Sequence, residues 1–233
     1  MVPALLYLLV RKYVVRNWPT IRKKMSQVVL PKNSLLFIGF LLLMLLKLAS
    51  LKAQDKRLQY NIVRNGKVIG WTKLTKTSTD QQVDIKLQSE AKTRFVFQFV
   101  VRAIEEVVFN NGTLVYSSQF RKLNADVKEN KSMKLTSNGY QLYKGKDVQA
   151  MSIRAVRQHM LALYFEEPKQ GDRFYSDSFQ QFLDVEKIAD GGYKIKLPDG
   201  NTCCYYYKNG ICTNVKIDHR FYAAELMLAQ STN

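Results

Sequence analysis

From residue 58 onward the chain consists of short segments in which apolar and polar residues alternate. Residues 58–62 show this pattern first, and Asn65-Gly66 ends it with a dipeptide that favours a tight hairpin, because both residues tolerate positive φ. Residues 83–87 and 95–101 repeat the alternation, which is the signature of half-buried strands. Further turn signals follow at Asn110-Asn111-Gly112, Asn138-Gly139 and Gly191-Gly192. The pattern predicts an antiparallel β meander rather than a βαβ fold.

One segment has a different period. Residues 152–165 read SIRAVRQHMLALYF, with apolar residues at spacings of three and four, Ser152 as an N-cap and Pro168 as a stop. The second half of the segment is apolar on all sides, which is typical of a buried helix. The predicted fold is therefore mainly β: an antiparallel meander forming a curved half-barrel around one buried α-helix, within a single domain over residues 54–233.

An apolar leader precedes this domain. Residues 34–46 read SLLFIGFLLLMLL between Lys32 and Lys47, and Ala53 supplies a small residue for cleavage. We interpret residues 25–53 as a signal peptide whose removal leaves Gln54 first, with a membrane anchor as the alternative, because Lys47 can snorkel and extend the short span. An N-terminal apolar leader helix is expected in either case.

Residues 1–24 form an extension whose role is open. They hold a second apolar stretch and a basic run, while Met25 begins a segment that would be a complete signal peptide by itself. Translation starting at Met25 is one reading, and a genuine membrane-associating extension from Met1 is the other. Both readings place the mature protein outside the cytoplasm, in the periplasm or associated with the cell envelope.

The positive charge is partly a property of the leader. The chain carries a formal net charge of +17, yet nine of its 36 basic residues and none of its 19 acidic ones fall within residues 1–53. The remaining basic residues are spread along strand-like segments, whereas nucleic-acid binding needs a concentrated basic face. We therefore expect no nucleic-acid partner, and membrane contact only through an uncleaved leader.

Reactive side chains are present, but they form no familiar constellation. The run CCYYYKNGIC (residues 203–212) is too compact for a structural zinc site. A two-residue turn at Asn209-Gly210 would set Tyr207 opposite Cys212, Cys204 opposite Val215 and Cys203 opposite Lys216. That register keeps the thiols too far apart for a disulfide and makes Cys204 a small packed hydrophobe.

The histidines and paired acids favour structural roles. His159 and His219 have no neighbouring nucleophile or metal-ligand spacing, so we expect no metal, no cofactor and no catalytic residue. Glu105-Glu106 and Glu166-Glu167 are adjacent pairs, and neighbours on a strand point to opposite faces. A secreted hydrolase with dispersed carboxylates remains the alternative function, and whether the protein is an enzyme at all is uncertain, with the balance leaning to no.

Aromatic residues are the strongest candidate for binding. Phe95, Phe97 and Phe99 share one strand face, and Tyr164 and Phe165 end the predicted helix. One interpretation is that these rings pack against the helix and fill the interior. The other is that part of the concave face stays open and holds an apolar ligand such as an acyl chain.

Four short patches follow one another along the second half of the chain: the run from Tyr164 to Pro168, Gly171-Asp172, residues 197–201 (LPDGN) and residues 206–212 (YYKNGIC). In these patches the chain resembles an uncharacterised family of exported Bacteroidetes proteins, and the resemblance covers about residues 58–228. It implies an antiparallel half-barrel around one helix, similar to bacterial lipoprotein-carrier domains, and it supplies no catalytic residues. The sequence thus predicts an exported, non-enzymatic binding or envelope-structural protein whose partner is an apolar small molecule or an envelope component.

Overall fold

The structure is a computed structural model that describes residues 54–94, 98–220 and 222–232. The predicted leader helix and the extension over residues 1–24 lie outside the described residues, as do Phe95 and Phe97. Residues 52–233 form one compact unit. The described residues of this unit share one contiguous hydrophobic core, which is what a domain needs to fold by itself.

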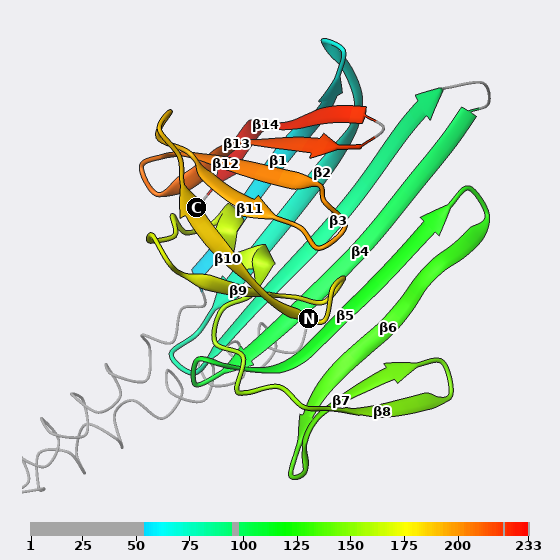
Figure 1. Cartoon of the computed structure of the whole chain (residues 1–233), viewed down its shortest axis with the longest axis vertical. Coiled ribbons are helices and arrows are strands. Elements are labelled where there is room, and N and C mark those ends of the chain that lie inside the picture. Colours follow the sequence, from blue (N-terminus) through cyan, green and yellow to red (C-terminus); the bar gives the residue numbers. More distant parts are fainter. Residues whose placement is uncertain (1–53, 95–97, 221, 233) are drawn as a thin grey trace, which may run out of the picture. The chain divides into compact units, whose positions relative to one another are not determined.

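Fourteen strands form a single antiparallel sheet in the order β8-β7-β6-β5-β4-β3-β2-β1-β14-β13-β12-β11-β10-β9 (Figure 1). Chain neighbours are sheet neighbours except for β8 and β9, which lie at the two ends of the sheet, and one further pairing joins β1 to β14. The strands are β1 Gln54–Arg64, β2 Lys67–Ser78, β3 Gln82–Arg94, β4 Gln98–Asn110, β5 Thr113–Leu123, β6 Asp126–Thr136, β7 Gly139–Lys144, β8 Asp147–Met151, β9 Arg173–Ser176, β10 Gln181–Lys187, β11 Tyr193–Lys196, β12 Thr202–Lys208, β13 Ile211–His219 and β14 Tyr222–Thr232.

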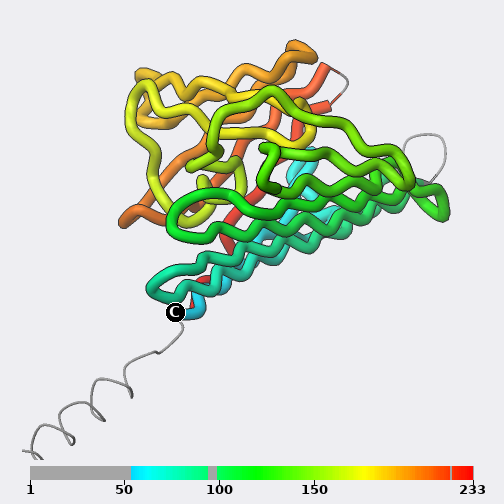
Figure 2. The backbone as a smooth tube through the Cα atoms, turned by 90° about the horizontal axis from the view of Figure 1, so that it is seen from below, coloured from blue at the N-terminus to red at the C-terminus, as the bar shows by residue number. Residues whose placement is uncertain are grey.

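The sheet is curved but not closed, because β8 and β9 are its two free ends. Within the described unit, β4–β6 (green) and β9–β12 (yellow to orange) lie as two layers (Figure 2). Buried side chains from both layers belong to one hydrophobic core cluster, which the short 3₁₀ helix η1 (Met160–Tyr164) also enters through Leu161 and Leu163. The prediction of a mainly antiparallel β fold is confirmed.

The predicted hairpin turns are present because their residues adopt the left-handed backbone that such turns require. Asn65 and Gly66 have φ of 50° and 72° between β1 and β2, and Asn209 and Gly210 have φ of 54° and 75° between β12 and β13. Two consecutive positive φ values define the type I′ turn, whose twist matches that of the flanking strands. The turns after β4, β6 and β10 also fall at the predicted positions.

The α-helix predicted over residues 152–165 is wrong. Residues 152–158 run without regular structure, and only Met160–Tyr164 coil, as one 3₁₀ helix whose N-cap is His159 rather than Ser152. Val156 O accepts a hydrogen bond from Leu114 N at 2.8 Å, and Gln158 O accepts one from Tyr175 N at 2.9 Å. Neighbouring strands therefore take the backbone groups that an α-helix would have used, and this tertiary pairing overrides the helical spacing.

The predicted register of the hairpin formed by β12 and β13 is wrong beyond its first pair. Tyr207 does face Cys212, but Cys204 pairs with Lys216 and Cys203 with Ile217. A β-bulge between Tyr206 and Tyr207 adds one residue to β13, and one added residue reverses which face the following side chains occupy. Cys212 shares a face with its partner Tyr207 and is fully buried, so it is the packed thiol in place of Cys204, while all three cysteines are free, as the sequence predicted.

Candidate functional site on the inner face of the sheet

The described residues cover the inner face of the long strands β1–β6, the face that carries the core, along only part of its length. Near the η1 end, Leu74, Ile85 and Val107 are at most 2% exposed and belong to the core cluster. Six residues back along β4, or about 20 Å at strand rise, Val101 is only half-buried and lies outside that cluster. The alternation of β4 is unbroken against β3, so Val101 and Val107 point to the same face.

A row of small and apolar side chains crosses the uncovered part. Ile62 pairs with Gly70, Gly70 with Ala91, Ala91 with Val101, and Val101 with Leu123. We call these five residues the apolar row. It crosses five adjacent strands, or about 19 Å at the usual strand spacing. Ile62 packs against the core, whereas Ala91, Val101 and Leu123 are half-buried outside it, so the row leads from the core toward solvent.

The predicted ligand-binding residues fall in two separate places. Phe99 lies opposite Thr93, two residues beyond Val101 on the same face of β4, and is half-buried. Tyr164 and Phe165 lie at the covered end, where the Tyr164 ring contacts Tyr60 edge-on at 5.5 Å. Phe165 is 3% exposed within the core. The structure thus brings Tyr164 and Phe165 together but sets Phe99 apart from them, beside the apolar row.

A buried polar network lies in the covered part of the inner face, where Ser117 is the cross-strand partner of Val107. Ser117 Oγ donates a 2.8 Å hydrogen bond to Asp177 Oδ1, and the other carboxylate oxygen of Asp177 lies 3.0 Å from His159 Nε2. Nδ1 of His159 accepts from Leu161 N at 3.1 Å and so caps η1. All three side chains are buried, which makes each hydrogen bond costly to lose. The network fastens η1 and the β9–β10 turn to β5.

The same residue types serve acyl transfer in hydrolases, but their order here does not suit that chemistry. In a catalytic triad the histidine lies between the serine and the acid and takes the serine proton. Here Asp177 lies between Ser117 and His159, and the histidine Nδ1 is already an acceptor for a backbone N–H. His159 Nε2 is then the donor to Asp177, which leaves no ring nitrogen to act as a base. Sequence spacing could not reveal this cluster, because its members come from β5, the η1 cap and the β9–β10 turn.

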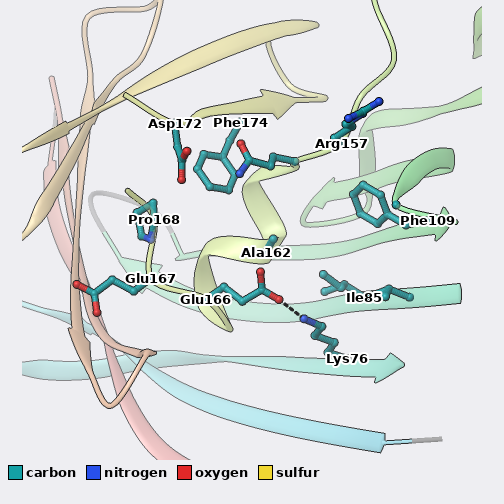
Figure 3. A pocket seen from close by; sticks show the side chains of 13 residues that line it. Lys76, Ile85, Phe109, Arg157, Ala162, Glu166, Glu167, Pro168, Asp172 and Phe174 are labelled. Carbon is teal, nitrogen blue, oxygen red and sulfur yellow. Dashed lines mark hydrogen bonds and ion pairs between the residues drawn. The ribbon is translucent and has the colours of Figure 1, made fainter. Parts of the chain in front are cut away.

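A cleft of about 190 Å³ opens beside η1, between β2–β4 and β9 (Figure 3). Its apolar wall includes Ile85, Phe109 and Phe174, and several of its polar groups already have partners within the protein. Lys76 forms an ion pair with Glu166, and Asp172 Oδ2 accepts a hydrogen bond from the backbone of Lys169. Because small-molecule sites usually measure about 300–1,000 Å³, this cleft suits at most a small group.

The acidic pairs hold the fold together through partners that the sequence did not identify. Glu105 faces inward, 3.5 Å from Arg121, while Glu106 is on the opposite face, where it pairs across the strands with Lys86. Glu166 forms an ion pair with Lys76, and Glu167 Oε1 accepts a 2.9 Å hydrogen bond from the Tyr193 hydroxyl group.

The thiols and buried phenols are held in their neutral forms. Burial raises the pKa of Cys203 to about 11 and that of Cys212 to about 12. Burial also raises the pKa of Tyr60, whose hydroxyl donates a 2.7 Å hydrogen bond to Cys212 O. A thiol with a raised pKa is a poor nucleophile at neutral pH, so these two cysteines act as packing groups.

The described residues form neither a metal-binding cluster nor a membrane-spanning helix. Within residues 54–94, 98–220 and 222–232, no group of three or more His, Cys, Asp or Glu side chains is arranged to hold a metal ion. None of the helices in this described part is long and apolar enough to cross a membrane.

Comparison with protein families places the chain. The family model described as Domain of unknown function (DUF6134) matches residues 60–229, which include nearly all of the sheet. The chain belongs to this family. No curated protein matches the chain. A crystal structure described as a beta-barrel-like protein of the domain of unknown function DUF1849 from Brucella abortus is similar at 9% identity and a TM-score of 0.46, covering 78% of this chain and 98% of that one.

Proposed function

We propose that this member of the DUF6134 family is a non-enzymatic binding protein of the cell envelope that holds an apolar ligand, such as an acyl chain, on the uncovered inner face of its sheet. The observation that carries the proposal is the apolar row. Ala91, Val101 and Leu123 are cross-strand neighbours that stay half-buried beyond the core. Removing such a surface from water is favourable at roughly 25 cal/mol per Å².

The surroundings of the row favour an elongated ligand over a compact one. Gly70 has no side chain and Ala91 has only a methyl group, so the surface is shallow along this part of the row. Phe99 and Leu123 supply larger side chains at its border. Toward the core, Thr72 Oγ1 donates a 3.0 Å hydrogen bond to Ser89 Oγ on the next row. A chain-like apolar ligand could thus lie across the strands with a polar end toward these hydroxyl groups.

A binding titration tests this proposal. Residues 54–233 would be titrated with a fluorescent fatty acid kept below its micelle concentration. We expect saturable binding, and we expect Val101→Asp to weaken it at least about ten-fold because a carboxylate would interrupt the apolar track. The matched control is Ile104→Asp on the same strand, since Ile104 is 41% exposed on the opposite face.

The outcomes of the titration separate clearly. Binding that is unaffected by Val101→Asp and by a second variant, Leu123→Asp, would contradict the proposal, as would the absence of any binding. Circular dichroism of each variant would show whether it keeps the β fold. Mass spectrometry of an organic extract of the native protein would then identify the natural ligand.

Export is a separate part of the proposal. It rests on the leader over residues 25–53, with its apolar run between Lys32 and Lys47. We expect the mature protein to begin at Gln54 and to be found in the periplasm or cell envelope. N-terminal sequencing of native material tests this, and a terminus upstream of Ser34 would instead indicate a membrane-anchored protein.

A further inference from the structure

The outer face of the sheet, opposite the core, carries lysines paired with aromatic rings. Lys73 Nζ lies 5.1 Å from the centre of the Trp71 ring, and Lys122 Nζ lies 5.4 Å from that of Phe120. Lys134 Nζ lies between two rings, 5.9 Å from Tyr116 and 5.6 Å from Tyr143. We call Trp71, Lys73, Tyr116, Phe120, Lys122 and Lys134 the lysine–aromatic face.

Strand register places these side chains together on one face. The buried residues of β2 are even-numbered, so the odd-numbered Trp71 and Lys73 point outward. The buried residues of β3 and β4 are odd-numbered, so their even-numbered residues lie on the same outer face. Phe120 lies directly opposite Ile104, and Tyr116 lies directly opposite both Val108 and Lys134. Ile104 is 41% exposed, so the lysines surround an apolar centre that solvent reaches.

The carboxylates on the outer face of β3 and β4 have other partners: Glu90 binds Arg102 and Lys92, Glu106 lies opposite Lys86, and Asp84 accepts a hydrogen bond from Gln82. The described residues give Lys73, Lys122 and Lys134 no ion pair. Arg102 and Lys122 are also direct cross-strand partners, an arrangement of like charges that costs stability in an isolated sheet. An anionic partner would offset that cost.

We propose that the lysine–aromatic face docks on an anionic lipid membrane. Trp and Tyr rings prefer the boundary between lipid headgroups and acyl chains, lysines bind headgroup phosphates, and a central Ile104–Phe120 pair can enter the apolar layer beneath them. An acidic polysaccharide would satisfy the lysines but would bury the exposed Ile104 less well. The inference uses no feature of the inner face, so it does not rest on the proposed ligand. It goes beyond the expectation that only the leader meets a membrane.

The test uses residues 54–233, the compact unit without the leader, because the basic apolar leader would bind vesicles by itself. This fragment contains a single tryptophan, Trp71, which lies within the lysine–aromatic face. Vesicles of phosphatidylcholine alone and with about one third phosphatidylglycerol would be added at low salt. We expect binding to the anionic vesicles only, a blue shift of the Trp71 emission, and quenching of Trp71 by lipids brominated along the acyl chain.

A pair of double variants locates the contact. Each lysine near an anionic membrane strengthens partitioning about five-fold, so Lys122→Glu with Lys134→Glu should weaken vesicle binding by at least about 25-fold. Lys169→Glu with Lys208→Glu makes the same change in net charge on exposed side chains away from this face and should keep most of the binding. Thermal unfolding would confirm that both double variants are folded.

Three results would overturn the proposal. One is that the fragment fails to bind anionic vesicles at low salt. Another is that the two double variants lose binding equally, which would indicate net charge rather than this face. The last is that Trp71 is not quenched while a soluble acidic polysaccharide binds in a manner that requires Lys122 and Lys134, which would make the partner a glycan.

Discussion

The two halves of the inner face are built from the same strands but have opposite roles. At the covered half, β4 presents Val107, fully buried between β3 and β5, and at the uncovered half it presents Val101, half-buried and outside the core. Residue type, strand and face are the same for both valines. Val107 belongs to the core cluster that residues of η1 and β9–β12 help to build, whereas Val101 lies outside it, so a side chain's contribution here depends on what the rest of the chain places around it.

The sharpest test of this difference introduces one charge at each half. Val107→Asp would leave a carboxylate buried without a partner, and we expect it to cost about 4 kcal/mol or more and to prevent stable folding. Val101→Asp should cost about 1 kcal/mol, since its carboxylate can reach water. Urea unfolding followed by circular dichroism measures both, and equal losses would show that the two halves are covered alike.

The buried polar network of Ser117, Asp177 and His159 should have the next largest effect. Asp177→Ala would leave Ser117 and His159 without their buried partner, and we expect a loss of about 2–3 kcal/mol in the free energy of unfolding. Asp177→Asn keeps one carbonyl acceptor and should lose about half as much. If Asp177→Ala were as stable as the unchanged protein, the network would not be what holds η1 against β5.

Gly70 offers a test inside the uncovered half, where tolerance is otherwise expected. A Cβ at this position would lie 2.1 Å from Glu90 O and 2.6 Å from Ala91 Cα, which are backbone atoms of the adjacent strand. We expect Gly70→Ala to cost about 2 kcal/mol, because β2 and β3 would have to move apart. A thermal shift no larger than that of an ordinary surface variant would show that the sheet yields easily here.

The smallest effect concerns one hydroxyl group in the covered half. Tyr60→Phe removes the donor to Cys212 O and should cost about 1 kcal/mol, because that buried carbonyl then lacks this hydrogen bond. The control is Tyr143→Phe, whose hydroxyl bonds the side chain of Gln141 on the same strand and should change stability by less than about 0.5 kcal/mol. Chemical denaturation of the two variants resolves the difference, and equal losses would contradict the argument from burial.

Part of the candidate site could be found from the sequence, and part could not. Alternation along residues 95–101 correctly marked the strand face on which Phe99 and Val101 lie, because side-chain direction in a strand has a period of two. It could not separate Phe99 from Tyr164 and Phe165, which reach the inner face at the other end. Nor could it find Ala91 and Leu123, which become neighbours of Val101 only through strand pairing.

By itself the sequence determined several of the strands, several of their turns and the class of the fold, because alternation and Asn-Gly turns are local properties that tertiary contacts reinforce here. Tertiary structure alone decided the rest. It gave the backbone carbonyls of Val156 and Gln158 partners on neighbouring strands in place of helical ones, and it buried Cys212 rather than Cys204. It also joined Ser117, His159 and Asp177, and within the described residues it left part of the inner face without a cover. Each of these outcomes depends on contacts between segments far apart in the chain, and no local pattern encodes such contacts.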